Sequence, residues 1–262
     1  MSQIIDFGYA NLSASWNDAY LALLFTTNED PSNIGQIPGP MAIADASRFV
    51  ELFEMQVGLS PLNVGTFAEA VDGDNPISTA IKKAKNARAR GMFPIIIGED
   101  RRITQKHCSD PLVAMWGKVG RIEADETNLL SNQPTILTGV RSATSSSFQA
   151  IPSNVTILTA YAITSQQKSM KEALTSITDP VHLSIDLDVL SPAVAQTSRS
   201  LEPGGLTWYD LMNTIEMIFD GPGVVAVDLV GTSAVAPRSP AALLGSQILL
   251  KVAGLLAARL GE

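Results

Sequence analysis

The sequence predicts a three-layer α/β/α fold around a mostly parallel sheet of about eight strands. Short apolar segments alternate with longer helical ones along all 262 residues, as in chains whose strands are joined by helical crossovers. Segment 94–98 is apolar and rich in β-branched residues, which is typical of a strand covered on both faces. No internal repeat, low-complexity tract or long linker interrupts the pattern. We therefore expect a single domain over residues 1–262.

Each element follows from local signals. Gly39 and Pro40 open a helical stretch, Gly91 ends an amphipathic one, and Thr207 is a suitable N-cap for another. Polar stretches at 123–133 and 142–147 are expected to be loops. The expected strands are 21–25, 62–67, 94–98, 112–116, 135–139, 154–158, 181–185 and 224–228, and the expected helices are 41–56, 77–90, 166–175, 208–219 and 240–260.

Composition excludes several classes of protein. The net charge of -8 and the absence of a basic stripe argue against binding to nucleic acid or to anionic membranes. A single cysteine, Cys108, excludes an internal disulfide and fits a reducing compartment. We see no signal peptide and no apolar run near the roughly 20 residues of a membrane span. A soluble cytoplasmic protein is expected.

Two acids mark the most informative segment. The apolar run 181–185 predicts a buried strand, and Asp186 and Asp188 follow at its carboxyl end. Residues two apart on a strand point to the same side, and ligands of parallel α/β sheets bind at that end. A pair of acids there usually holds a divalent metal or takes part in acid–base chemistry.

The stretch from His182 to Thr207 closely resembles the signature of the ureohydrolase superfamily, which includes arginase, agmatinase and formimidoylglutamase. In that signature a Ser-x-Asp-x-Asp-x-x-Asp-Pro segment supplies ligands to a two-manganese centre. The segment Glu-Pro-Gly-Gly-Leu-Thr at 202–207 is kept intact. Further segments match in family order, at 35–43, 94–104, 139–141 and 227–233. The resemblance covers nearly the whole chain and implies an arginase-like fold.

The chain departs from this signature where the family binds metal. The resemblance implies two imidazole and four carboxylate ligands, which together offset the charge of two Mn²⁺ ions. Arg101 stands where a ligating histidine is usual, and residues 117–121 align with an Asp-Ala-His-x-Asp segment without keeping a donor. Of the ligand positions only Asp186 and Asp188 remain. We expect no bound manganese and no other cofactor.

Substrate-binding positions have changed as well. Ser191 replaces the third acid of the signature, and Gly231 takes the place of the acid that binds the guanidinium group in the family. Thr197 and Arg199 stand where the family has two glycines that allow close approach of backbone to ligand. These changes predict that the guanidinium clamp is lost together with the metal.

Asp186 and Asp188 are then expected to be vestigial ligand positions whose charges are balanced by cations. The family geometry would bring Arg101, Lys118 and Arg121 towards them, and buried carboxylates need such partners. We expect a guanidinium of Arg101 or Arg121 within hydrogen-bonding distance of one of the acids. The alternative is a residual metal pair.

Other polar residues receive structural interpretations. Asp100 has no adjacent base and is expected to make structural hydrogen bonds. His182, at the start of an apolar strand, is expected to be a satisfied core histidine. Cys108 adjoins His107, but neighbours on a helix point in different directions, so a cysteine–histidine nucleophile is not expected.

The leading functional hypothesis is a degenerate ureohydrolase homologue that lacks amidinohydrolase activity and has a regulatory, structural or ligand-binding role. The alternative is a hydrolase of linear amidine C–N bonds with a non-standard site at Asp186 and Asp188. A third hypothesis is a binder of a small anion in a pocket lined by Arg101, Arg121 and Arg199. Relatives form oligomers, so a homo-oligomer or an assembly with a related subunit is expected.

Overall fold

The computed structural model describes residues 3–4, 19–27, 38–51, 53–60, 65–119, 130, 132–166, 170–195, 202–232 and 238–260. The chain divides into two compact units. Unit 1 comprises Met1–Asp100 and Thr232–Glu262, and unit 2 comprises Arg101–Gly231. The expected single domain over residues 1–262 stays a prediction, and the two units are described separately.

Unit 1 is built around parallel strands that are buried on both faces. Strand β2 pairs in parallel with β3 and with β4, and the short β1 adds to β3 in the antiparallel sense. All residues of β2, β3 and β4 are buried because these strands are covered by helices on both sides. The strands are β1 (Gln3–Ile4), β2 (Leu21–Thr26), β3 (Thr66–Val71) and β4 (Phe93–Ile97).

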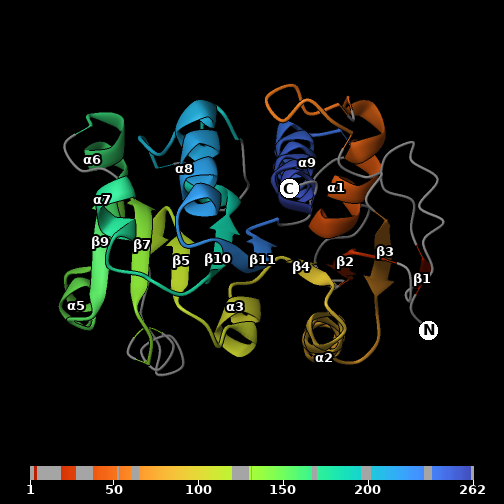
Figure 1. Cartoon of the computed structure of the whole chain (residues 1–262). Helices are drawn as coiled ribbons and strands as arrows, with labels where there is room; N and C mark the ends of the chain where they lie inside the picture. The colour runs from red at the N-terminus through yellow and green to blue at the C-terminus, as the bar shows by residue number, and fades with distance from the viewer. Residues whose placement is uncertain are drawn as a thin grey trace. The chain divides into compact units, whose positions relative to one another are not determined.

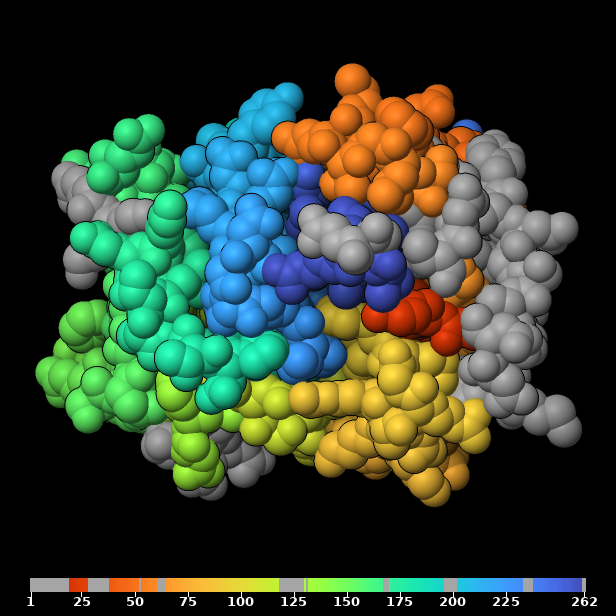
Figure 2. All heavy atoms as spheres, viewed as in Figure 1, coloured from red at the N-terminus to blue at the C-terminus, as the bar shows by residue number. Residues whose placement is uncertain are grey.

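Helices cover both faces of the unit 1 strands. Helix α2 lies on one side, and α1 and α9, which pack on each other, lie on the other (Figure 1). In the space-filling view the side chains of α2 form the lower surface of this unit (Figure 2). The helices are α1 (Gly39–Ala46), the 3₁₀ turn η1 (Ser47–Phe49), α2 (Pro76–Ala89) and α9 (Pro240–Leu260).

The expected end of helix α2 matches the structure within one residue, because its signals are local. Asn75 caps the amino end by accepting a hydrogen bond from Ser78 N at 3.1 Å, and Pro76 occupies the first turn. Ile77, Ala80, Ile81 and Ala84 are buried on one face. Gly91, with a φ of 81°, follows the helix.

Two expected elements of unit 1 were misplaced. The strand predicted at 62–67 is β3 at Thr66–Val71, and the helix predicted at 41–56 ends as α1 at Ala46 before the short η1. Strand β3 was misplaced because it contains Glu69, and a buried carboxylate is unusual in the middle of a strand. Glu69 is only 5% exposed and is held by Lys83 Nζ at 2.9 Å.

Helix α9 is long and apolar enough to cross a membrane, although the sequence analysis found no such run. Of its most apolar window, 72% is buried inside the protein, which fits a core helix. Gly245 lets the helix approach α1 closely, since a Cβ there would lie 2.8 Å from Ile43 Cγ1. Lys251 is buried and lies 3.5 Å from Glu54 Oε1.

Unit 2 contains five parallel strands in the order β11-β10-β5-β7-β9. Together with β2, β3 and β4 they make eight parallel strands, the number expected. The strands are β5 (Leu112–Met115), β7 (Thr135–Val140), β9 (Val155–Thr159), β10 (Val181–Asp186) and β11 (Val224–Val230). A separate parallel pair is formed by β6 (Lys118–Val119) and β8 (Ser142–Ala143).

The helices of unit 2 connect these strands, and α3 and α8 lie on opposite sides of them (Figure 1). Helix α8 begins at a capping box in which Thr207 and Asp210 exchange hydrogen bonds. Helices α5 and α6 were not predicted, and each begins at a threonine cap, Thr144 or Thr159. The helices are α3 (Arg102–His107), α5 (Ser145–Gln149), α6 (Ala160–Thr164), α7 (Met170–Leu174), the 3₁₀ turn η3 (Leu187–Val189) and α8 (Trp208–Asp220).

Candidate functional site

Strand β10 carries the first predicted site residue at its carboxyl end. It lies between β11 and β5, and its last residue, Asp186, is 7% exposed. The Oδ1 atom of Asp186 accepts a hydrogen bond from the main-chain nitrogen of Asp188 at 2.9 Å. Asp188 lies in the turn η3, not in the strand, so strand alternation does not decide where its side chain points.

Arg101 faces Asp186. It precedes helix α3, and its Nε lies 3.5 Å from Asp186 Oδ2. The guanidinium carbon also lies 4.9 Å from the centre of the Trp116 ring, within the range of a cation–π contact. The side chains of Arg101 and Asp186 are 26% and 10% exposed. The expected cation beside the acid is therefore present as a partly buried ion pair.

The Arg101→Ala variant is expected to lower the free energy of unfolding by about 1–3 kcal/mol. Without the guanidinium, Asp186 lacks its cationic partner. Because Arg101 is partly exposed to solvent, the decrease in stability should be smaller than for a fully buried ion pair. Chemical denaturation would measure it. The matched control is Arg102→Ala, whose side chain is exposed. Equal effects of the two substitutions would contradict a role for the ion pair.

Two glycines near Asp186 and Asp188 have no room for a side chain. A Cβ atom at Gly231 would lie 3.0 Å from Asp186 Cγ and still closer to Asp186 Oδ1, and Gly231 has a φ of +73°. A Cβ at Gly117 would lie 2.9 Å from the carbonyl carbon of Asp188. That carbonyl oxygen accepts a hydrogen bond from Arg141 Nη1.

The described residues do not test the remaining predicted site residues. Asp100 is half-buried and belongs to unit 1, and its structural role stays a prediction. Arg121 and Arg199 lie outside the described residues, as does the side chain of Lys118. Their approach to the acids stays a prediction.

A buried polar network that the sequence analysis missed joins α3, β10 and β11. His107 Nδ1 lies 3.0 Å from Asp228 Oδ1, and His182 Nε2 lies 2.7 Å from Asp228 Oδ2. The two imidazole rings meet edge to face with centroids 4.8 Å apart. His182 is thus a satisfied core histidine, as expected. Asp228 was noted only as part of a family segment.

Electrostatics favour a proton in this network. Burial lowers the pKa of His182, but the charge of Asp228 and the hydrogen bond to Asp228 raise it to about 10. Burial raises the pKa of Asp228, but the two imidazoles hold it well below its usual range. A carboxylate and one imidazolium are then neutral together, which suits a fully buried position.

The same three residues are a candidate metal-ligating set, since their donor atoms lie within 4.8 Å of one another. One ring nitrogen of each histidine and both carboxylate oxygens of Asp228 are already engaged in hydrogen bonds. A cation would have to break both bonds and displace the protons. The arrangement therefore favours an internal ion pair.

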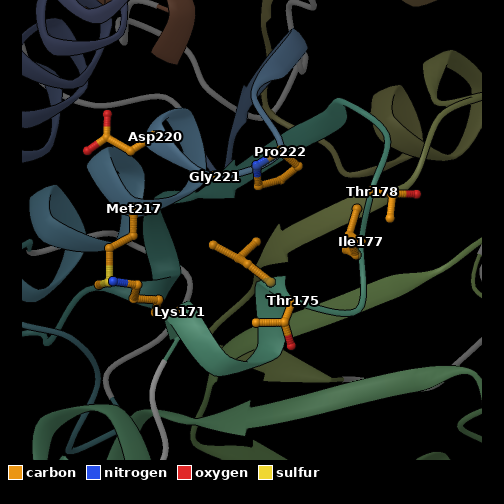
Figure 3. Close-up of a pocket in the computed structure, with 9 residues that line it drawn as sticks. Lys171, Thr175, Ile177, Thr178, Met217, Asp220, Gly221 and Pro222 are labelled. Carbon is orange, nitrogen blue, oxygen red and sulfur yellow. The ribbon is translucent and has the colours of Figure 1, made fainter.

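Among the cavities lined by the described residues of unit 2, two are large enough to hold a small ligand. One of about 370 Å³ lies where β7 and β9 end, and it is lined by Val140, Arg141, Thr159, Tyr161, Gly204 and Gly205, among others. The other, of about 530 Å³, lies between α7 and the end of α8, near the amino ends of β10 and β11. In the view of Figure 3, Met217 and Lys171 lie on one side of it, and Ile177 and Thr178 lie on the other.

Comparison with known proteins was made by sequence and by structure. The family model described as "Arginase family" matches residues 113–254, more than half of the chain. The N(1)-aminopropylagmatine ureohydrolase of Synechocystis is 25% identical in an alignment of length 225 that covers 73% of this chain and 74% of that protein. This match spans both units.

Solved structures show the same fold. The agmatine ureohydrolase of Thermoplasma volcanium has a TM-score of 0.74 and 16% identity, with coverage of 97% of this chain and 95% of that one. The formimidoylglutamase of Bacillus subtilis has a TM-score of 0.75 and 16% identity, with coverage of 97% and 90%. These likenesses confirm the arginase-like α/β fold with its eight parallel strands.

Proposed function

This chain belongs to the arginase family, and we propose that it is a member without a two-manganese centre and without amidine hydrolysis. The observation that carries the proposal is the ion pair between Arg101 and Asp186. A guanidinium stands where the family signature has a ligating histidine, and it already supplies the positive charge that the acid needs. A divalent cation beside Asp186 would be repelled by it.

The donor set does not fit a manganese pair. Hard cations take several oxygen ligands, with imidazole nitrogen in sites of this family. Asp186 Oδ1 is engaged by the main chain of Asp188, and Oδ2 faces Arg101. The two histidines of the chain are both bound to Asp228. Two carboxylates alone would hold a metal weakly.

Gly117 and Gly231 support the same proposal. They align with an aspartate ligand and with the acid that binds the guanidinium group, and neither position has space for a Cβ. Asp186 and the main chain of Asp188 occupy that space. Restoring either acid would require the neighbouring backbone or carboxylate to shift.

The role that remains is non-catalytic. We propose a regulatory or structural subunit, in a homo-oligomer or together with a related subunit, in the cytoplasm. A small anionic ligand is a further part of the proposal, and the cavity beside Arg141 supports it, because that cavity lies at the carboxyl edge of the strands and no acidic residue lines it.

Metal content and urea release test the proposal. After dialysis against manganese, elemental analysis should find no stoichiometric metal, and urea release from arginine or agmatine should match the buffer blank. Without a metal to lower its pKa, water is a poor nucleophile near neutral pH. An agmatine ureohydrolase treated in the same way serves as the positive control. Two metals per chain, or turnover above the blank, would contradict the proposal.

The alternative is a hydrolase of linear amidine C–N bonds. It is favoured by the sequence relatives, which include ureohydrolases of N(1)-aminopropylagmatine, and by the retained pair Asp186 and Asp188. If turnover is found, Asp188→Asn should abolish it. Turnover that survives this substitution would place the reaction elsewhere.

A further inference from the structure

Strand β9 forms one edge of the unit 2 strands, whose order ends β5-β7-β9. Among the described residues it pairs with β7 alone, in parallel, from Thr135 opposite Val155 to Val140 opposite Thr159. In Figure 1 it is the outermost strand of the unit, with α5 below it and α6 above it. An edge strand presents a row of main-chain N–H and C=O groups on its outer side, to which a further strand can bind.

Burial distinguishes β9 from its neighbours. All residues of β5, β7 and β10 are buried, but in β9 only Leu158 is. Thr156 and Thr159 are exposed, and Val155 and Ile157 are partly exposed. Val155 and Ile157 also pack against the hydrophobic core of unit 2. The core therefore holds the strand in place, while its outer edge stays accessible to another chain.

The edge lacks the residues that usually prevent pairing with another strand. Exposed edges commonly carry lysine or proline, but β9 reads Val-Thr-Ile-Leu-Thr, and its β-branched residues favour a sheet. The uncharged stretch extends well beyond the strand. Residues 142–166 contain no Lys, Arg, Asp or Glu, although 17% of the chain is charged.

Two exposed aromatic side chains flank the strand in sequence. Phe148 belongs to α5, which precedes β9, and Tyr161 belongs to α6, which follows it. They are 59% and 68% exposed. Aromatic residues are enriched in protein–protein interfaces, where charged residues are depleted. Residues 142–166, which we call the neutral flank, thus combine a bare strand edge with the composition of an interface.

Charge identifies the partner that fits the neutral flank. The chain carries a net charge of -8, so two copies repel each other, and the repulsion is weakest where the facing surfaces hold no charge. A strongly charged partner would find no group of opposite sign on this flank. A strand is also complementary to itself, since two copies related by a two-fold axis pair in the antiparallel sense.

We propose that β9 is the pairing edge of a homodimer. Two copies join their β9 strands in the antiparallel sense about a two-fold axis, so that the strands of the two copies form one continuous sheet across the interface. The proposal rests on the homo-oligomer part of the proposed function and assigns its surface. It does not depend on the loss of the metal centre.

Hydrogen exchange of main-chain amides tests the pairing on the intact chain. Peptides that cover residues 155–159 should exchange more slowly as protein concentration rises, because pairing places the outward amides in hydrogen bonds. Sedimentation velocity of the same samples should show dimers. A dimer whose β9 amides exchange as in the monomer would overturn this inference and leave the homo-oligomer standing. A monomer at every concentration would overturn both.

The Thr156→Lys variant is a second test, since lysine on an edge strand opposes pairing. It should raise the dissociation constant of the dimer about tenfold or more. Thr178→Lys adds the same charge at another exposed position of unit 2 and should leave the constant unchanged. Equal effects of the two substitutions would overturn the assignment of the interface to β9. If Thr156→Lys does not fold, the exchange measurement on the native chain decides.

Discussion

Replacement of Asp228 with alanine is expected to lower the free energy of unfolding by about 3–5 kcal/mol. The carboxylate is fully buried and accepts hydrogen bonds from His107 and His182. Its removal takes away the charge that keeps His182 protonated, and leaves two buried imidazole groups without their acceptor. Urea denaturation measures the loss, with Asp179→Ala, at an exposed loop position, as the control.

The same network predicts how stability varies with pH. The pKa of His182 is raised from 6.5 to about 10, so its contribution is fully present below about pH 6.5 and is lost as pH rises towards 10. The pKa of Asp228 is lowered, so its contribution is present above about pH 4 and is lost below it. Stability should be greatest between these limits.

The fall in the free energy of unfolding at alkaline pH is the part of the pH dependence that comes from the histidine network. The wild-type protein should lose more than about 1 kcal/mol per pH unit over part of this range. In the Asp228→Ala variant His182 keeps no raised pKa from this partner, so most of that slope should vanish. An unchanged slope, or a variant as stable as the wild type, would show that the ion pair contributes little.

Replacement of Gly231 with alanine is expected to cost about 2–5 kcal/mol. The residue has a φ of +73°, which an L side chain rarely adopts, and this strain alone costs about 1–2 kcal/mol. The added Cβ would also meet the carboxylate of Asp186, and overpacking of this kind typically costs 1–3 kcal/mol more, by rough estimate.

Gly58 offers a matched control for the backbone strain. Its φ is +75°, and nothing lies within 4 Å of its Cβ position. The difference between Gly231→Ala and Gly58→Ala therefore isolates the clash with Asp186. Adding Asp186→Ala to Gly231→Ala should relieve that clash, so the two substitutions should not be additive. Equal costs at the two glycines would mean that Asp186 yields easily, and that an acid could be restored at this position.

The sequence alone determined most of the architecture. The apolar runs of β2, β4, β5, β7, β10 and β11, and the helical periodicity of α2, α8 and α9, were identified within a few residues. These signals are local, because burial on one or both faces imposes a period on neighbouring residues. The errors at β3, α5 and α6 have local causes too. A strand that contains the buried Glu69 was misplaced. Helices α5 and α6 each start at a threonine cap and have only 5 residues, too few to show a helical period in the sequence.

The vestigial site was predictable in outline. Family motifs placed Asp186 at the end of β10 and Arg101 near it, and charge balance predicted their ion pair, which lies at 3.5 Å. The sequence could not show that Asp188 leaves the strand for a 3₁₀ turn. Nor could it show that Asp186 and the main chain of Asp188 take the space beside Gly231 and Gly117. Those facts depend on the path of the backbone after β10.

Only the tertiary structure decided the histidine network. His107 and Asp228 are separated by 121 positions, and His182 and Asp228 by 46. No periodicity connects such residues. They meet because β10 and β11 pair in parallel, with Ser184 opposite Asp228, and because α3 packs against β11. Hydrophobic pattern determines which segments are buried, whereas the register of paired strands determines which polar side chains are buried together.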